Sequence, residues 1–215
     1  MMFAVLVAGS LMAGCATMPE RIEPALLSEA SADQNAQIQQ INQDIIKKRE
    51  ECVAAAKALE IGESAIVVSK EQVKTYDQSA KLLNAQMNFY NLQNTKDKVD
   101  ATAKLIDQNN KRTVQEKANL DYLSIYRDQL GVEKDLRDLE LANLLAKVDL
   151  LKAKIALDYQ TKRQEKTPLK VEKYQAFADD LAKQLFNKQE EQKKAAEKTA
   201  RAKDALAKTG YGAQQ

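Results

Sequence analysis

The chain has 215 residues, with 33 Lys and Arg against 31 Asp and Glu, and it contains no His, no Trp, two Cys, three Pro and six Gly. The absence of His excludes a Ser-His-Asp triad, a Cys-His pair and a His-ligated metal site. Few Gly and Pro leave too little turn chemistry for a many-stranded sheet, while 30% charged and 5% aromatic residues are typical of long helices. The composition therefore predicts an all-α protein without catalytic, cofactor-binding or metal-binding residues.

An uncharged apolar run at residues 3–13 leads into the motif Met12-Ala-Gly-Cys15. The run is too short to span a bilayer and has the length of the apolar part of an export signal. Small residues before a cysteine resemble the bacterial lipoprotein signal, in which that cysteine is lipidated and becomes the first residue. The resemblance implies a signal peptide at residues 1–14, lipidation of Cys15 and a membrane anchor that needs no protein span.

The motif departs from that signal in two respects. Residues 1–3 lack the Lys or Arg that export signals carry, which a start upstream of Met1 would explain, and Met12 stands where Leu is usual. Ala16 follows the cysteine in place of the Asp associated with inner-membrane retention, so the resemblance implies the outer membrane, with the chain facing the periplasm or the cell surface. The alternative is that residues 1–15 form an apolar helix buried in a partner, or a short anchor.

Lipidation of Cys15 would leave Cys52 as the remaining thiol in an oxidising compartment, so no disulfide within the chain is expected. Cys52 falls in an apolar pattern and is interpreted as a small residue packed in a helix seam. The alternative is an intermolecular disulfide with Cys52 of a second copy.

Residues 15–30 are expected to be a tether, because they contain Pro19 and Pro24 and show little periodicity. Ser31 and Gln34 have the spacing of a capping box, which predicts a helix start. Residues at spacings of three and four then follow, the pattern of a coiled-coil seam. These are Ile38, Ile41, Ile45, Lys48, Cys52, Ala55 and Leu59.

Three turns are predicted, at 62–68, 108–112 and 164–168. Gly62 interrupts the first seam, and the capping-box spacing of Ser69 with Gln72 predicts a second helix, or the first one resumed. The seam of this segment consists of Val73, Tyr76, Ala80, Leu83, Met87 and Tyr90. The polar residues 107–112 precede a further capping box, Thr113 with Glu116. Near Gly131 the apolar pattern loses register, and it resumes at Leu141.

The residues after 141 form a wide apolar face, which indicates more than one neighbouring helix. A last helix is predicted from Thr167 as N-cap and Pro168 as its first residue, with Val171, Tyr174, Ala178, Leu181 and Leu185 as its seam. The predicted fold is thus all-α, an elongated antiparallel coiled-coil hairpin or helical bundle over residues 31–186. A basic Ala/Lys/Glu-rich helical tail with a flexible end is expected at 187–215.

The stretch 119–159 reads NLDYLSIYRDQLGVEKDLRDLELANLLAKVDLLKAKIALDY. Its use of Leu and Ala resembles the long periplasmic helices of the TolC-like outer-membrane efflux family, over about forty residues. The rest of the chain departs from that family, because no segment offers the alternating strands of a membrane barrel and the chain is too short for a duplicated channel subunit. The resemblance implies a shared style of helical hairpin, not a channel.

Residues 160–208 hold thirteen Lys and Arg against eight Asp and Glu. This surplus is interpreted as a solvated helix face, the alternative being contact with anionic lipid, peptidoglycan or an acidic partner. Nucleic acid is not expected, because the segment lacks interleaved aromatic residues for stacking. Adjacent carboxylates, Asp179 with Asp180 and Glu190 with Glu191, point about 100° apart on a helix and do not converge on one substrate atom.

These patterns predict a membrane-anchored, non-enzymatic structural or adaptor protein of the bacterial cell envelope, acting through coiled-coil contacts with envelope proteins, peptidoglycan or further copies of itself. The alternative, which follows from the stretch 119–159, is an accessory subunit of an outer-membrane efflux or secretion channel. A hydrolase that uses carboxylates alone is the remaining class.

Overall fold

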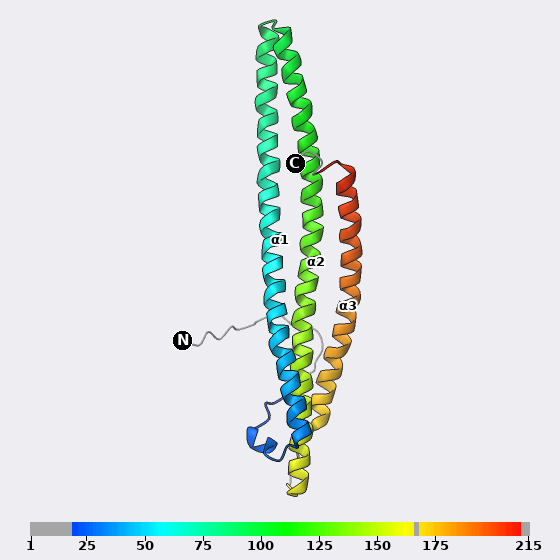
Figure 1. Ribbon diagram of the computed structural model, residues 1–215. Coiled ribbons are helices and arrows are strands. Elements are labelled where there is room, and N and C mark those ends of the chain that lie inside the picture. The colour runs from blue at the N-terminus through cyan, green and yellow to red at the C-terminus, as the bar shows by residue number, and fades with distance from the viewer. Residues whose placement is uncertain (1–18, 166–167, 212–215) are drawn as a thin grey trace, which may run out of the picture. The chain divides into compact units, whose positions relative to one another are not determined.

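The computed structural model describes residues 19–165 and 168–211. Cys15, the expected signal peptide and Thr167 lie outside these residues. Three long helices, α1 (Ala32–Leu92), α2 (Lys96–Lys162) and α3 (Val171–Lys208), follow the short 3₁₀ helix η1 (Pro24–Leu27) (Figure 1). The helices pack against each other and the described ranges contain no strand, so the predicted all-α bundle or hairpin is confirmed.

The described residues form two compact units, and each unit contains a segment of all three helices. The first unit combines residues up to 46 with residues 141–185, and the second combines 47–140 with residues from 186 onward. The expected tail therefore belongs to the same unit as the middle of the chain. Each unit is described below by itself.

The predicted start of α1 is confirmed by its cap. The Ser31 backbone N–H donates to Gln34 Oε1 at 2.8 Å, and the Gln34 N–H donates to Ser31 Oγ at 3.1 Å. This reciprocal pair satisfies two N–H groups that a helix start leaves free. The sequence pattern therefore fixed this helix end to the residue.

The predicted turn at 62–68 is wrong, because α1 runs through it. Gly62, Ile66 and Ser69 continue the spacing of three and four, so one seam connects Ile38 to Tyr90, and every position of it is buried or half-buried. A Cβ at Gly62 would lie 2.8 Å from Leu130 Cδ1 of α2. Gly62 thus occupies a seam position where the two helices approach closely, and it does not end the helix.

The predicted turn at 108–112 is also wrong. Within the second unit, Thr102, Asn109 and Glu116 are buried polar residues of α2, and Asn109 Nδ2 donates to the Tyr76 backbone carbonyl of α1 at 3.0 Å. Gly131 does not interrupt α2, and the seam passes it through Arg127, the buried Leu130 and Lys134. The register is therefore kept by polar residues where the apolar pattern appeared to fail.

The turn between α1 and α2 lies at residues 93–95, where no turn was predicted. Asn94 adopts a left-handed backbone conformation with φ 53°, and the Thr95 N–H donates to the Tyr90 carbonyl at 3.2 Å. Asn tolerates this conformation and closes a helix end in the same way as Gly. This turn makes α1 and α2 antiparallel neighbours in the second unit (Figure 1).

The predicted fold-back near 164–168 is confirmed, since α2 ends at Lys162 and α3 begins at Val171. The prediction that α3 starts at Pro168 is wrong by three residues. The Leu169 N–H donates to the buried Gln160 side chain at 2.8 Å. This bond holds the residues before α3 against the end of α2.

The core of the first unit forms around two alanines of α2, Ala153 and Ala156, which have no exposed surface. Tyr174 of α3 and Ile22 pack on them, and the Tyr174 hydroxyl donates to the Glu20 carbonyl at 2.6 Å. Leu26 and Leu27 of η1 cover the same cluster. Part of the expected tether is therefore folded onto the helices.

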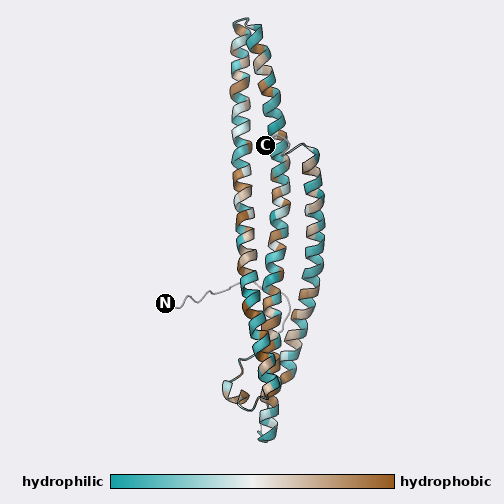
Figure 2. Ribbon diagram, in the orientation of Figure 1, coloured by the Kyte–Doolittle hydropathy of each residue, from teal (hydrophilic) through white to brown (hydrophobic). Residues whose placement is uncertain are grey.

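A second line of α2 positions, again at spacings of three and four, faces α3. In the second unit, Gln115 Nε2 donates to the Thr209 carbonyl at 2.9 Å, and in the first unit Ala153 packs against Tyr174. The prediction of more than one neighbour for α2 is confirmed. The part of α3 after Leu185 is mostly hydrophilic (Figure 2), although Thr199 and Leu206 are buried.

Candidate functional site

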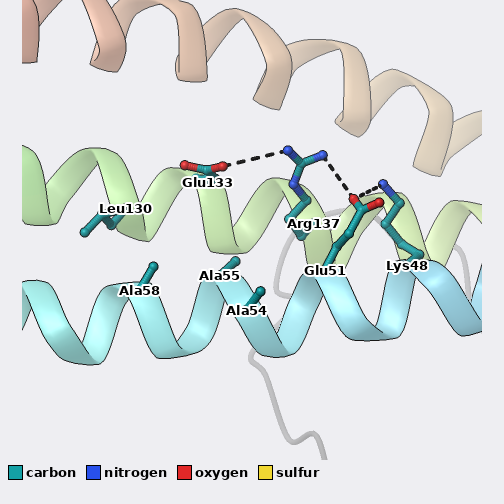
Figure 3. Close-up of a pocket in the computed structure, with 8 residues that line it drawn as sticks. All are labelled: Lys48, Glu51, Ala54, Ala55, Ala58, Leu130, Glu133 and Arg137. Atoms are coloured by element: carbon teal, nitrogen blue, oxygen red, sulfur yellow. Dashed lines mark hydrogen bonds and ion pairs between the residues drawn. The ribbon is translucent and has the colours of Figure 1, made fainter.

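The most polar part of the α1–α2 seam lies in the second unit and is called the charged layer here. It consists of Lys48 and Glu51 of α1 with Glu133, Arg137 and Glu140 of α2. Figure 3 shows these side chains except that of Glu140. Lys48 and Arg137 fall on the seam of each helix, so the heptad spacing itself turns these two cations toward the partner helix.

The layer is held by ion pairs from both helices. Lys48 Nζ lies 2.6 Å from Glu51 Oε2 and 2.9 Å from Glu140 Oε2. Arg137 Nη1 lies 3.0 Å from Glu140 Oε2 and 3.5 Å from Glu51 Oε2. Figure 3 shows the Glu51 carboxylate between the two cations, with Glu133 on the far side of Arg137. Both carboxylates are therefore shared between Lys48 and Arg137.

The electrostatics of the layer keep its groups charged. Burial lowers the pKa of the Lys48 ammonium, but hydrogen bonds to Glu51 and Glu140 outweigh it and hold that pKa above its ordinary value. The hydrogen bond from Lys48, with the nearby Arg137 charge, lowers the pKa of the Glu51 carboxyl. A general acid or base needs a pKa near the working pH, and both shifts move away from neutrality. The chemistry of the layer is thus ion pairing.

A groove of about 570 Å³ runs beside the charged layer. Lys48, Glu51 and Arg137 line one end, Ala58 and Leu130 line the other, and Ala54, Ala55 and Glu133 lie between them (Figure 3). The alanine side chains are small, so they leave the space of this groove along α1 unfilled.

Cys52 is half-buried in the seam next to the charged layer, as the packing interpretation expects. Burial, followed by the charge and hydrogen bond of Asp138, raises the pKa of the Cys52 thiol to about 11. Asp138 is itself paired with Lys134 at 2.8 Å. The intermolecular disulfide through Cys52 stays a prediction, although a thiol of this kind is a poor nucleophile at neutral pH.

We expect Cys52 to react with iodoacetamide at pH 8 at least about 10-fold more slowly than an ordinary exposed thiol, because little thiolate is present. The rate should rise as the pH approaches 11. The measurement is the alkylation rate of a Cys15→Ala chain, so that Cys52 is the single thiol, with the same chain in urea as the control. An equal rate with and without urea would contradict the seam position.

A second polar cluster lies farther along the second unit. Ser69 Oγ donates to Glu116 Oε1 at 2.6 Å, and Asn119 Nδ2 donates to the same oxygen at 3.0 Å. Burial, with the nearby Glu116, raises the pKa of the Tyr211 hydroxyl after the end of α3. Ser69 and Glu116 come from the two motifs that predicted helix starts, and both predictions are wrong: these residues pair between helices.

The carboxylate pairs on α3 are placed as expected for a helix surface, with separate partners. Asp179 accepts from Gln175, and Asp180 accepts from Gln184. Glu190 pairs with Lys193 at 2.6 Å and Glu191 pairs with Lys188 at 2.8 Å. None of these pairs converges on a common point. Cys15 lies outside the described residues, so the structure places no atom of the expected lipidation site.

The sequence reasoning identified Lys48 as the polar member of a seam but missed its partners. Glu51, Glu133 and Glu140 flank the seam, where charged residues are common and carry no particular signal. The signal that was available is the unbroken register of α2, which places Arg137 on the seam. Extending that register through Gly131 would have predicted that Lys48 of α1 and Arg137 of α2 both lie at the α1–α2 interface.

No cluster of His, Cys, Asp and Glu suited to a metal ion occurs within residues 19–165 and 168–211. In the same residues, no helix combines the length and the apolar character needed to cross a membrane. The chain matches no protein-family model, and no curated protein and no solved structure shows significant similarity to it.

Proposed function

We propose that this chain is a non-enzymatic structural or adaptor component of the bacterial cell envelope, lipid-anchored through Cys15 in the outer membrane. The proposal combines two features of the chain. The motif ending at Cys15 supplies an anchor, and the helices supply long surfaces for contact with proteins or peptidoglycan. Together they describe a molecule that connects the membrane to a partner.

The observation that carries the non-enzymatic part is the composition of the helix seams. The most polar clusters of the described residues lie between helices, and their charged groups are already paired with each other. Lys48 and Glu51 are held in their charged forms and Cys52 in its thiol form. Perturbed groups at catalytic sites are normally shifted toward the working pH, and these are shifted away from it.

Lipidation is tested by metabolic labelling. Cells that express the full chain are grown with a palmitate analogue, and we expect label on the wild-type chain and none on a Cys15→Ala variant. A Cys52→Ala variant is the matched control and should keep the label, because Cys52 is not part of the signal motif. A wild-type chain without label, or label that survives Cys15→Ala, would contradict the anchor.

An accessory subunit of an efflux or secretion channel is the second candidate, supported by the resemblance of residues 119–159 to TolC-like helices. The two candidates differ in what the lipidated protein retains during purification from its own membranes. Recovery of an outer-membrane channel or its transporter favours the accessory subunit, provided that the same purification from cells without the chain does not recover it. Recovery of peptidoglycan or other envelope proteins without a channel favours the adaptor.

A further inference from the structure

A second stripe runs along α1 in the second unit, beside the α1–α2 seam. Most of its positions are exposed, and Ala58, Ala65 and Ser79 are half-buried. The residues at its eleven positions recur at spacings of three and four, as in the seam itself, and none is charged. We call these positions the outer stripe. They are Ala54, Ala58, Ile61, Ala65, Val68, Gln72, Thr75, Ser79, Leu82, Gln86 and Phe89.

No position of the outer stripe is charged, although Lys57 and Glu71 border it, three or four residues from Ile61, Val68 and Thr75. The charged residues within 54–89 all occupy other helix positions; they are Lys57, Glu60, Glu63, Lys70, Glu71, Lys74, Asp77 and Lys81. In a chain with 30% charged residues, a solvated helix face is normally where charge gathers. Here one face of α1 excludes it.

The large side chains of the outer stripe are exposed. Ile61, Val68, Leu82 and Phe89 expose 60%, 64%, 61% and 55% of their surfaces. Their spacing of seven residues, with one gap filled by Thr75, places them in one row that turns by about 20° per heptad around a straight helix. On a protein surface that faces water, exposed apolar rows of this kind mark sites of interaction with another molecule.

We propose that a second copy of this chain packs antiparallel on the outer stripe. The pattern is self-complementary, because an antiparallel two-fold arrangement places each large residue opposite a small or uncharged one. In the register centred between residues 73 and 74, Phe89 faces Ala58 of the second copy, Leu82 faces Ala65, and Val68 faces Ser79. Large residues that face small ones fill a helix interface without voids, and a two-fold axis uses the same surface on both copies.

The area of the outer stripe is sufficient for a specific dimer. A 36-residue helical surface is about 54 Å long and about 10 Å wide. Two such surfaces together remove on the order of 1,000 Å² from water, which is the size that a stable interface requires. The absence of charge on the stripe means that neither copy has to bury an ion. This surface is independent of the lipid anchor and goes beyond the proposed function.

Two adjacent valines provide a matched test. Val68 lies on the outer stripe, whereas Val67, which is 62% exposed against 64% for Val68, points about 100° away from it, among charged residues. We expect Val68→Lys to weaken dimerisation of the full Cys15→Ala chain by about 100-fold, because the lysine would be buried without a partner. Val67→Lys should leave the dimer unchanged, and circular dichroism should show equal helix content in both.

The measurement is analytical ultracentrifugation in a nonionic detergent. A wild-type chain that stays monomeric at micromolar concentration would overturn the proposal, and so would equal weakening by the two lysine variants. A monomer with a normal palmitate label would leave the lipoprotein assignment intact, so the two proposals fail separately.

Disulfide crosslinking tests the orientation. In a chain without native cysteines, Ala58→Cys with Phe89→Cys should form covalent dimers on mild oxidation, because the two positions face each other. Phe89→Cys alone should not, since the two copies of residue 89 would lie about 46 Å apart along the helices. Crosslinking by the single variant would show parallel pairing and contradict the proposed arrangement.

Discussion

Glu140→Gln is expected to lower the free energy of unfolding by about 1–3 kcal/mol, because Glu140 is the carboxylate that both Lys48 and Arg137 contact at 3.0 Å or less. Its side chain is only 20% exposed and that of Lys48 only 18%, so solvent does not replace the lost ion pairs. Urea unfolding of the Cys15→Ala chain, followed by circular dichroism, measures the effect.

Glu133→Gln is the control on the same helix. Its carboxylate lies 3.7 Å from Arg137 and its side chain is 35% exposed, so we expect a change of less than about 0.5 kcal/mol. Equal effects of the two substitutions would show that the charged layer is an ordinary surface network and that its half-buried ion pairs contribute nothing of their own.

The charged layer has a second expected property. Replacing Lys48, Glu51, Arg137 and Glu140 together by Leu should be neutral or stabilising, because a well-packed apolar layer avoids the cost of desolvating ions and leaves no shared carboxylate without its cations. If the layer instead sets the register of α1 against α2, the apolar variant should populate more than one pairing of the helices. A thermal transition broader than that of the wild-type chain, at equal helix content, would reveal this.

Ala156→Leu should destabilise the first unit by about 2 kcal/mol, since Ala156 has no exposed surface and packs with Ala153, Tyr174 and Ile22. The added atoms have no free volume, and Tyr174 and η1 would have to move. The expected result is earlier unfolding in urea and loss of the Tyr174 near-ultraviolet signal.

Ala176→Leu is the matched control, because Ala176 is an exposed residue of α3 in the same unit. Its free energy of unfolding should change by less than about 0.5 kcal/mol. A similar loss in both variants would mean that leucine disturbs this unit at any position, and the close packing around Ala156 would not be the cause.

The sequence predicted the helical seams well, because a seam follows from the spacing of residues along one helix. The spacing from Ile38 to Leu59 and from Val73 to Tyr90 identified the residues that the structure places between helices. The α1 start was predicted to the residue, since the Ser31–Gln34 pair bonds within four residues of chain. The lipidation of Cys15 and the function that depends on it remain predictions.

The turns were predicted poorly for a physical reason. Ser69 and Thr113, each followed three residues later by Gln or Glu, have the spacing of a helix start, and a helix interface can use the same residues for bonds to a neighbour. In the structure, the Ser69 hydroxyl donates a hydrogen bond to the Glu116 carboxylate, and the Asn109 side-chain amide donates one to the Tyr76 backbone carbonyl. A local pattern cannot distinguish the two uses, because the partner lies 33 or 47 residues away in the chain.

By itself the sequence determined that the chain is helical, which residues face the seams, and where the first helix begins, since each depends on contacts within one or two helical turns. The tertiary structure alone decided that the chain first reverses at 93–95, that η1 covers Ala153 and Ala156, and that Lys48 and Arg137 share two carboxylates. These features depend on which distant segments become neighbours. A polar side chain in a seam needs a partner, which the opposite helix supplies to Lys48 through Glu140 and the same helix supplies to Lys134 through Asp138.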